Sequence, residues 1–204
     1  FRTIKPEGNA GRFWQYLAKS GFDDVDKLTT LYELKYASTG KWKDRIIIPI
    51  FIKGKLVSWT SRAIGKPINA PRYLALSEEE GGLVNVFNAL WNYDELMQGG
   101  ETLLVAEGPF DAMKLDFYAA EFNSCATCTF GTSMSVEQAL LIAEVSKRFK
   151  RSFLLYDEGA TEAIFLAKEK LIHTKVECTF LPAGADDPGE MSRKQVRHLF
   201  NSLQ

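Results

Sequence analysis

Apolar residues near the start of the chain recur at helical spacing. Phe13, Trp14 and Leu17 lie three or four residues apart, which places side chains on one face of a helix. Asn9 can cap the start of this helix, and Gly21 follows its last turn. We therefore predict a first helix between these two residues, followed by a second, short helix over 25–31.

The pattern then changes to runs that are rich in β-branched and aromatic residues. Residues 45–52 read RIIIPIFI and residues 56–62 read LVSWTSR, with the turn Lys53-Gly54-Lys55 between them. Two such runs around a short glycine-containing turn predict a β-hairpin. Pro49 has no amide hydrogen, so we expect an edge strand or a bulge at that position.

From residue 87 onward, short apolar runs alternate with amphipathic stretches. The predicted strands are 102–106, 125–130, 153–156 and 175–180, and the predicted helices are 87–97, 109–121, 136–149 and 160–172. This alternation predicts an α/β fold with a mainly parallel sheet flanked by helices. Ser192 and Gln195 have the spacing of a capping box, which predicts a last helix that ends near Leu203.

The length of 204 residues, 46% of them hydrophobic, permits one core or two small adjoining ones. The segment 78–82 reads EEEGG, and such polar, glycine-bearing segments are typical of a boundary. We predict a small mixed α/β basic subdomain at 1–82, a sheet domain at 83–191 and a C-terminal helix at 192–204.

Other features bear on the cellular compartment. The sequence has no stretch of about 18 uncharged apolar residues, so we expect no membrane segment and a cytoplasmic location. The three cysteines, Cys125, Cys128 and Cys178, are odd in number and lie on predicted strands, which fits reduced thiols. The first two have CxxC spacing but lack the second pair of ligands that a zinc site needs.

Charge is distributed unevenly along the chain, although its net value is only -1. Residues 1–76 hold 14 Lys and Arg against 6 Asp and Glu, whereas residues 77–204 hold 11 against 20. A basic half can attract a phosphate backbone while an acidic half concentrates divalent cations. Chance segregation of solvated charges explains the same division, and charge alone does not choose between the two interpretations.

Acidic residues follow three of the predicted strands, directly after the first two and six residues after the third. They are Glu107, then Asp157 with Glu158, and then Asp186 with Asp187. The reactive groups of α/β sheets gather at the carboxyl ends of the strands, so we expect these carboxylates to converge. Such a set of oxygen ligands suits Mg²⁺ or Mn²⁺, which promote phosphoryl and nucleotidyl transfer.

These residues also carry a resemblance to a known family. Glu107-Gly-Pro-Phe-Asp111 resembles the EGxxD opening of Toprim domains, Gly131-Thr-Ser-Met-Ser135 their glycine turn, and Asp157 the start of their DxD segment. Upstream, Arg45-Ile-Ile-Ile-Pro-Ile, Ser61-Arg62 and Pro71-Arg72-Tyr73-Leu74 are similar to segments of bacterial and phage-type, DnaG-like DNA primases. The resemblance covers roughly Phe13 to Met191 and implies a Toprim sheet preceded by a basic subdomain.

The resemblance implies a nucleotidyltransferase that makes short RNA primers on single-stranded DNA from nucleoside triphosphates during DNA replication. Glu107 and Asp157 would be catalytic, and Mg²⁺ or Mn²⁺ would be held by Glu107, Asp157 and Asp187, with Glu158 and Asp186 as possible substitutes. Arg62 and Arg72 would face template or nucleotide, and Arg45, Lys53 and Lys55 could line the DNA path or be ordinary solvated charges. Gly108 and Gly131 would serve backbone conformation, and Asp111 would orient Glu107 or cap backbone amides.

The resemblance also implies a replicative helicase as partner, whereas the zinc-binding domain usual in the family is not expected within this chain. Two departures weaken the likeness: Gly159 and Gly189 stand where the family carries the second acid of DxD and DPD. Two alternatives consequently stay open. One is a Toprim nuclease that uses the same carboxylates, and the other is a catalytically weak DNA-binding clamp.

Overall fold

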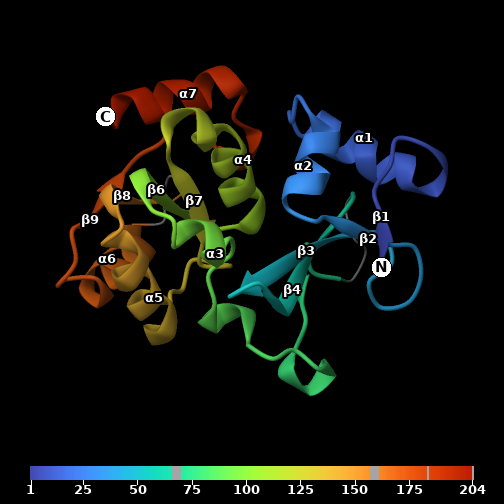
Figure 1. Ribbon diagram of the computed structural model, residues 1–204, viewed down its shortest axis with the longest axis horizontal. Coiled ribbons are helices and arrows are strands. Elements are labelled where there is room, and N and C mark those ends of the chain that lie inside the picture. The colour runs from blue at the N-terminus through green and yellow to red at the C-terminus, as the bar shows by residue number, and fades with distance from the viewer. Residues whose placement is uncertain (66–69, 157–160, 183, 204) are drawn as a thin grey trace. The chain divides into compact units, whose positions relative to one another are not determined.

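The computed structural model describes residues 1–65, 70–156, 161–182 and 184–203, coloured along the chain in Figure 1. The chain divides into two compact units. Unit 1 comprises Phe1–Ile50 and Lys55–Val86, and unit 2 comprises Phe51–Gly54 and Phe87–Gln204. No helix within the described residues is long and apolar enough to cross a membrane.

Unit 1 is built on an antiparallel sheet, which has five strands in the described residues, in the order β1-β2-β3-β4-β5. The strands are β1 (Arg2–Thr3), β2 (Lys35–Ala37), β3 (Arg45–Ile52), β4 (Lys55–Ala63) and β5 (Tyr73–Ala75). The predicted hairpin is therefore present as β3 and β4, and the 3-10 turn η2 (Glu78–Glu80) follows the sheet. Ile46, Ile48 and Ile50 lie two residues apart on one face of β3, and all three are fully buried.

Two helices of unit 1 cover this sheet. They are α1 (Gly11–Lys19), which the 3-10 turn η1 (Gly8–Ala10) precedes, and α2 (Val25–Leu31). Phe13 and Leu17 of α1 are fully buried, and the ring of Phe13 lies 4.5 Å from that of Tyr36 on β2. The pattern of the sequence thus predicted both helices correctly. The predicted cap at Asn9 is wrong, because Asn9 lies inside η1 and Ala10 precedes α1 without a side-chain cap.

Pro49 does not mark an edge strand, because β3 lies in the middle of the sheet. The register between β2 and β3 runs only from Arg45 to Ile47 on β3. Pro49 lies beyond that stretch, so its missing amide hydrogen breaks no bond to β2. A central strand accommodates this proline because the neighbouring strand β2 is short. The local sequence pattern around Pro49 does not reveal the length of β2.

Unit 2 contains a parallel sheet of four strands in the described residues, in the order β7-β6-β8-β9. Its elements are η3 (Val86–Asn88), α3 (Tyr93–Leu96), β6 (Gly100–Ala106), α4 (Pro109–Ala119), η4 (Ala120–Phe122), β7 (Cys125–Cys128), α5 (Val136–Ser146), β8 (Phe149–Leu155), α6 (Thr161–Lys170), β9 (Val176–Thr179), η5 (Pro188–Glu190) and α7 (Arg193–Ser202). The predicted α/β fold with a parallel sheet is confirmed.

Helices cover both faces of this sheet (Figure 1). On one face, Leu103 and Val105 of β6 belong to a buried cluster with Ile142 and Val145 of α5. The alternate positions of β6 point to the other face, where α4 packs on β6 and β7 and α7 packs on α4. This two-sided burial explains why the strands read as continuous apolar runs.

Two predicted boundaries in unit 2 are wrong. The helix expected over 87–97 is broken, because Asn92 adopts a left-handed conformation with φ of +63°. The carbonyls of Ala89 and Trp91 accept hydrogen bonds from Gln138 Nε2 at 3.1 Å and Thr127 Oγ1 at 2.6 Å instead of bonding within a helix. In addition, β8 starts at Phe149 because Phe149 pairs with Gly100 of β6, a long-range contact that local periodicity does not show.

Candidate active site

The connections of the parallel sheet place a crevice at the carboxyl ends of β6 and β8. After β6 the chain passes through α4 to β7 on one side, and after β8 it passes through α6 to β9 on the other side. The strand order therefore reverses between β6 and β8. In open α/β sheets ligands bind at such a switch point, and Glu107 is the first residue beyond β6.

The backbone around Glu107 is held by bonds to the neighbouring strand end. Gly131 N donates to Glu107 O at 2.9 Å, and Thr129 N donates to Ala106 O at 3.1 Å. The Glu107 side chain is half-buried. The turn around Gly131 thus fixes the direction in which the chain leaves β6.

Asp111 caps the first turn of α4. Its Oδ2 accepts a hydrogen bond from Gly108 N at 3.0 Å, which satisfies an amide that the start of a helix leaves without a partner. A Cβ atom on Gly108 would lie only 2.4 Å from that oxygen. Gly108 therefore allows the close approach of the Asp111 carboxylate to the backbone beside Glu107.

The segment after β9 returns to the same corner of unit 2, where η5 packs against α4. Asp187 Oδ1 accepts from Gly189 N at 2.6 Å. A Cβ atom on Gly189 would lie 2.8 Å from Asp111 Oδ1 and 3.0 Å from Asp187 Oδ1. The carboxylates of Asp111 and Asp187, 76 positions apart in the sequence, therefore converge on Gly189.

The donor chemistry of this corner suits a hard divalent cation, because the converging atoms are carboxylate oxygens. Asp186 is exposed beside Asp187. Within the part of the chain that the structure describes, no three His, Cys, Asp or Glu side chains form a group that could hold a metal ion. Asp157 and Glu158, the acids expected after β8, lie outside the described residues.

Sequence reasoning missed Tyr156, the residue directly before Asp157. Its side chain is 2% exposed, and its buried hydroxyl has Thr129 as a polar neighbour. Burial, and to a smaller extent the negative charge of Glu107, raises the pKa of the Tyr156 hydroxyl to about 12. The Tyr156 hydroxyl near Glu107 therefore stays neutral. The sequence feature that could have identified Tyr156 is a tyrosine at the carboxyl end of an apolar strand.

Lys114 was also missed, and it lies three residues after Asp111 on the same side of α4. It is fully buried between Met113 and Leu115, and Asp116, two residues further on, is buried too. A charged ammonium is rarely buried in proteins unless it is paired. The sequence signal would have been a lysine between apolar residues, close to Asp116, in the helix that follows the EGxxD motif.

In unit 1, Arg62 is held by two tyrosines. Its Nε donates to Tyr16 Oη at 2.8 Å, and a terminal nitrogen donates to Tyr73 Oη at 2.5 Å. Burial lowers the pKa of Arg62, but its contacts with Tyr73 and Tyr16 outweigh burial and shift the pKa upward. The Arg62 guanidinium is thus a permanently charged group in a fixed orientation.

The other four cations expected to contact nucleic acid or nucleotide differ in exposure. Arg45 is only 4% exposed, and its guanidinium donates to the carbonyls of Pro71 at 2.6 Å and Arg72 at 3.3 Å. This burial favours a structural role for Arg45 over a place on a DNA path. The side chains of Arg72, Lys53 and Lys55 are exposed.

An antiparallel sheet unit followed by a doubly wound parallel unit defines a two-part α/β fold. No family model and no curated protein matches the sequence. Solved structures do match. The DnaG primase catalytic domain bound to single-stranded DNA has a TM-score of 0.78 at 20% identity, over 99% of this chain and 73% of that one.

Two further structures agree. The DnaG catalytic core has a TM-score of 0.76 at 19% identity, covering 97% of this chain and 74% of that chain. The primase fragment of the bacteriophage T7 primase-helicase has a TM-score of 0.64 at 16% identity, covering 88% of this chain and 70% of that chain. The chain therefore has the fold of the catalytic core of DnaG-type primases, as the sequence resemblance implied.

Proposed function

We propose that this chain is the catalytic core of a DNA primase, which makes short RNA primers on single-stranded DNA by metal-dependent nucleotidyl transfer. The observation that carries the proposal is the agreement of fold over 99% of the chain with a primase catalytic domain. The convergence of the Asp111 and Asp187 carboxylates on Gly189, beside the turn that follows Glu107, supports it. The DNA-bound neighbour supports single-stranded DNA as a partner.

In this proposal the 3′-oxygen of the growing primer forms a bond to the α-phosphorus of the incoming triphosphate, and pyrophosphate leaves. Glu107 would ligate metal or accept the proton of the 3′-hydroxyl, and Asp111, which accepts from Gly108 N, would orient the turn that carries Glu107. Asp157 and Asp187, with Glu158 and Asp186 as substitutes for the missing acids, would hold Mg²⁺ or Mn²⁺. The bound ion would lower the pKa of the hydroxyl and stabilise the leaving pyrophosphate.

The basic residues of segment 53–72 have a separate task in this proposal. Arg62, held in orientation by its two tyrosines, would contact phosphates of template or nucleotide. Exposed Arg72, Lys53 and Lys55 would add sequence-independent attraction to the DNA backbone. The replicative helicase remains the partner expected for such a core.

The test is a primer-synthesis assay with labelled nucleoside triphosphates on single-stranded templates, in Mg²⁺ and in Mn²⁺. Glu107→Gln should lower synthesis at least about 100-fold, because it removes the carboxylate at the reacting centre. Anisotropy with a labelled oligonucleotide should show nearly unchanged DNA binding. Glu169→Gln, on the exposed surface of α6, is the matched control and should retain full synthesis.

The same experiment separates the alternatives. Unchanged synthesis by Glu107→Gln would remove the assignment of that residue. Cleavage of plasmid in Mn²⁺ without nucleotides, lost in Glu107→Gln, would identify a Toprim nuclease instead. DNA binding by the wild-type chain with neither synthesis nor cleavage would identify a non-catalytic clamp. The glycines Gly159 and Gly189, which replace the family's second acids, would explain the lost catalysis.

A further inference from the structure

Unit 2 carries a groove at the edge of its sheet where β8 and β9 begin. The groove has a volume of about 760 Å³, and its wall includes residues of α5, the first residues of β8, and the connection from α6 to β9. Glu107 follows the opposite, carboxyl end of β6, which runs parallel to β8. The groove, called the α5–β8 groove below, therefore has its β8 residues at the other edge of the sheet from the candidate active site and extends along α5 to Val136.

The floor of the α5–β8 groove is aliphatic. Its main apolar side chains are Val136, Ala139, Leu140 and Ala143 of α5 and Phe149 at the start of β8. Leu140 is 66% exposed and Val136 is 62% exposed, although both lie on a helix whose other side is buried in the core. A concave site with exposed aliphatic side chains is suited to receive apolar side chains from another molecule.

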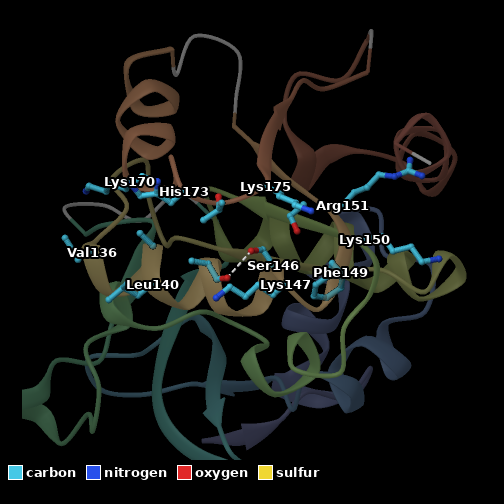
Figure 2. Close-up of a pocket in the computed structure, with 14 residues that line it drawn as sticks. Val136, Leu140, Ser146, Lys147, Phe149, Lys150, Arg151, Lys170, His173 and Lys175 are labelled. Atoms are coloured by element: carbon cyan, nitrogen blue, oxygen red, sulfur yellow. Dashed lines mark hydrogen bonds between the residues drawn. The ribbon is translucent and has the colours of Figure 1, made fainter.

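The rim of the groove is basic. Lys147, Lys150, Arg151, Lys170, His173 and Lys175 line it, and none of its described lining residues is acidic (Figure 2). Figure 2 shows Lys170, His173 and Lys175, from the end of α6 and its connection to β9, above Lys147, which follows α5, with Lys150 and Arg151 of β8 at one side. Five of the 11 Lys and Arg residues in the acidic half of the chain thus gather at one place.

Part of this charge is not neutralised within the chain. Among the described residues, Lys147 and Lys175 take part in no ion pair, whereas Lys150 pairs with Glu101 at 2.6 Å on the exposed surface. Arg151 donates to the Leu203 carbonyl at 2.5 Å. Clustered cations at the rim of a groove raise the local concentration of anionic ligands.

We propose that the α5–β8 groove binds an acidic peptide segment of a partner protein, with Leu, Ile or Phe side chains between its acidic residues. The apolar side chains would occupy the aliphatic floor, and the carboxylates would face the lysines of the rim. A single nucleic-acid strand fits less well, because strand binding uses exposed aromatic rings for stacking. The lining has two rings, of which Phe149 is only 7% exposed, so the exposed imidazole of His173 is a single stacking platform where a strand would need several.

The test measures anisotropy of a fluorescein-labelled nonapeptide in which Asp and Glu alternate with Leu, added to the full chain without nucleotides. Two peptides serve as comparisons, one with every Leu replaced by Ser and one with every acid replaced by Lys. A labelled oligomer of 12 thymidines is the nucleic-acid probe. The acidic, leucine-bearing peptide should bind with a dissociation constant of about 1–100 µM, because small interfaces retain little net affinity.

Two variants probe the two parts of the groove. Leu140→Ser should weaken peptide binding about fivefold to tenfold, because the floor loses an apolar contact. The double variant Lys147→Glu/Lys175→Glu should weaken it about tenfold at low salt, since exposed charge pairs contribute little each. Leu83→Ser, an equally exposed leucine in unit 1, and Lys194→Glu on α7 are the matched controls and should bind as the wild type does.

Several results would overturn the proposal. They are absence of saturable binding, equal binding of the leucine and serine peptides, and binding that neither groove variant changes. Thymidine binding that the lysine double variant abolishes and Leu140→Ser leaves intact would assign the groove to nucleic acid instead. Thermal melting of each variant confirms that the substitutions, which replace solvent-facing side chains, leave the fold intact.

Discussion

Replacement of Gly189 by alanine tests the packing around the candidate active site with a single methyl group. The new Cβ would lie 2.8 Å from Asp111 Oδ1 and 3.0 Å from Asp187 Oδ1. These distances are well below the roughly 3.5–4.0 Å separation that is optimal for non-bonded carbon contacts. The Asp111 carboxylate must therefore move, and movement breaks its 3.0 Å hydrogen bond with Gly108 N.

The cost follows from the function of that hydrogen bond. Asp111 satisfies an amide at the start of α4, and loss of a side-chain cap costs about 0.5–2 kcal/mol. Partial displacement of Asp187 from its 2.6 Å bond with Gly189 N adds to this. We expect Gly189→Ala to lower the free energy of unfolding by about 1–2 kcal/mol. In a chain of this size the melting temperature should fall by about 2–4 °C per kcal/mol.

A double-mutant cycle separates the clash from other effects of the methyl group. Asp111→Ala removes the carboxylate that the new Cβ meets, so adding Gly189→Ala to it should cost less than about 0.5 kcal/mol. Urea unfolding followed by circular dichroism measures all four proteins. Additive costs, or Gly189→Ala as stable as the wild type, would refute the close packing of Asp111 on Gly189. For the same reason, Gly189→Asp should not restore a second metal-binding acid at this position.

Two further predictions concern charge. Burial raises the pKa of the Cys125 thiol from 9.0 to about 12 and that of the Tyr156 hydroxyl from 10.0 to about 12. Between the unfolded and the folded pKa values, both groups are therefore neutral in the folded protein and ionised in the unfolded chain. Their contribution to stability is complete below about pH 9 and is lost as the pH rises toward 12. Urea unfolding midpoints at pH 8 and pH 10.5 measure this loss. If the midpoint of Tyr156→Phe changes with pH as much as that of the wild type, the role of Tyr156 is contradicted. Arg62→Lys should destabilise unit 1 by about 1–2 kcal/mol, because lysine cannot make both tyrosine bonds in the same geometry. Calorimetry of Arg62→Lys beside exposed Arg72→Lys checks this, and equal stability of the two variants would count against it.

Local sequence patterns predicted the kinds of element well where burial was uniform. The apolar run before Glu107 forms β6, and the capping box of Ser192 and Gln195 starts α7, with Ser192 N donating to Gln195 Oε1 at 3.0 Å. The hairpin of β3 and β4 formed around Gly54 as its turn residues indicated. In these cases the residues that decide the conformation are neighbours in the sequence.

Elsewhere, contacts between distant residues overrode the local pattern. The stretch 87–97 has helical spacing, yet its carbonyls bond to side chains from β7 and α5, and Asn92 interrupts it. The buried pair of bonds from Arg45 to the backbone of 71–72 likewise could not be read from a lone arginine in a basic segment. Burial of a charged group depends on what packs over it, which a local window does not contain.

The sequence by itself determined the order of strands and helices, the acids at three strand ends and the likeness to primases, because these depend on periodicity and motif spacing. Only the tertiary structure decided that Asp111 and Asp187 meet at Gly189, that Tyr156 and Lys114 are buried, and that a basic groove lies beside α5. Each of these facts rests on the order β7-β6-β8-β9, which brings together segments far apart in the chain. Strand order follows from the packing of the whole sheet, and no single strand carries it.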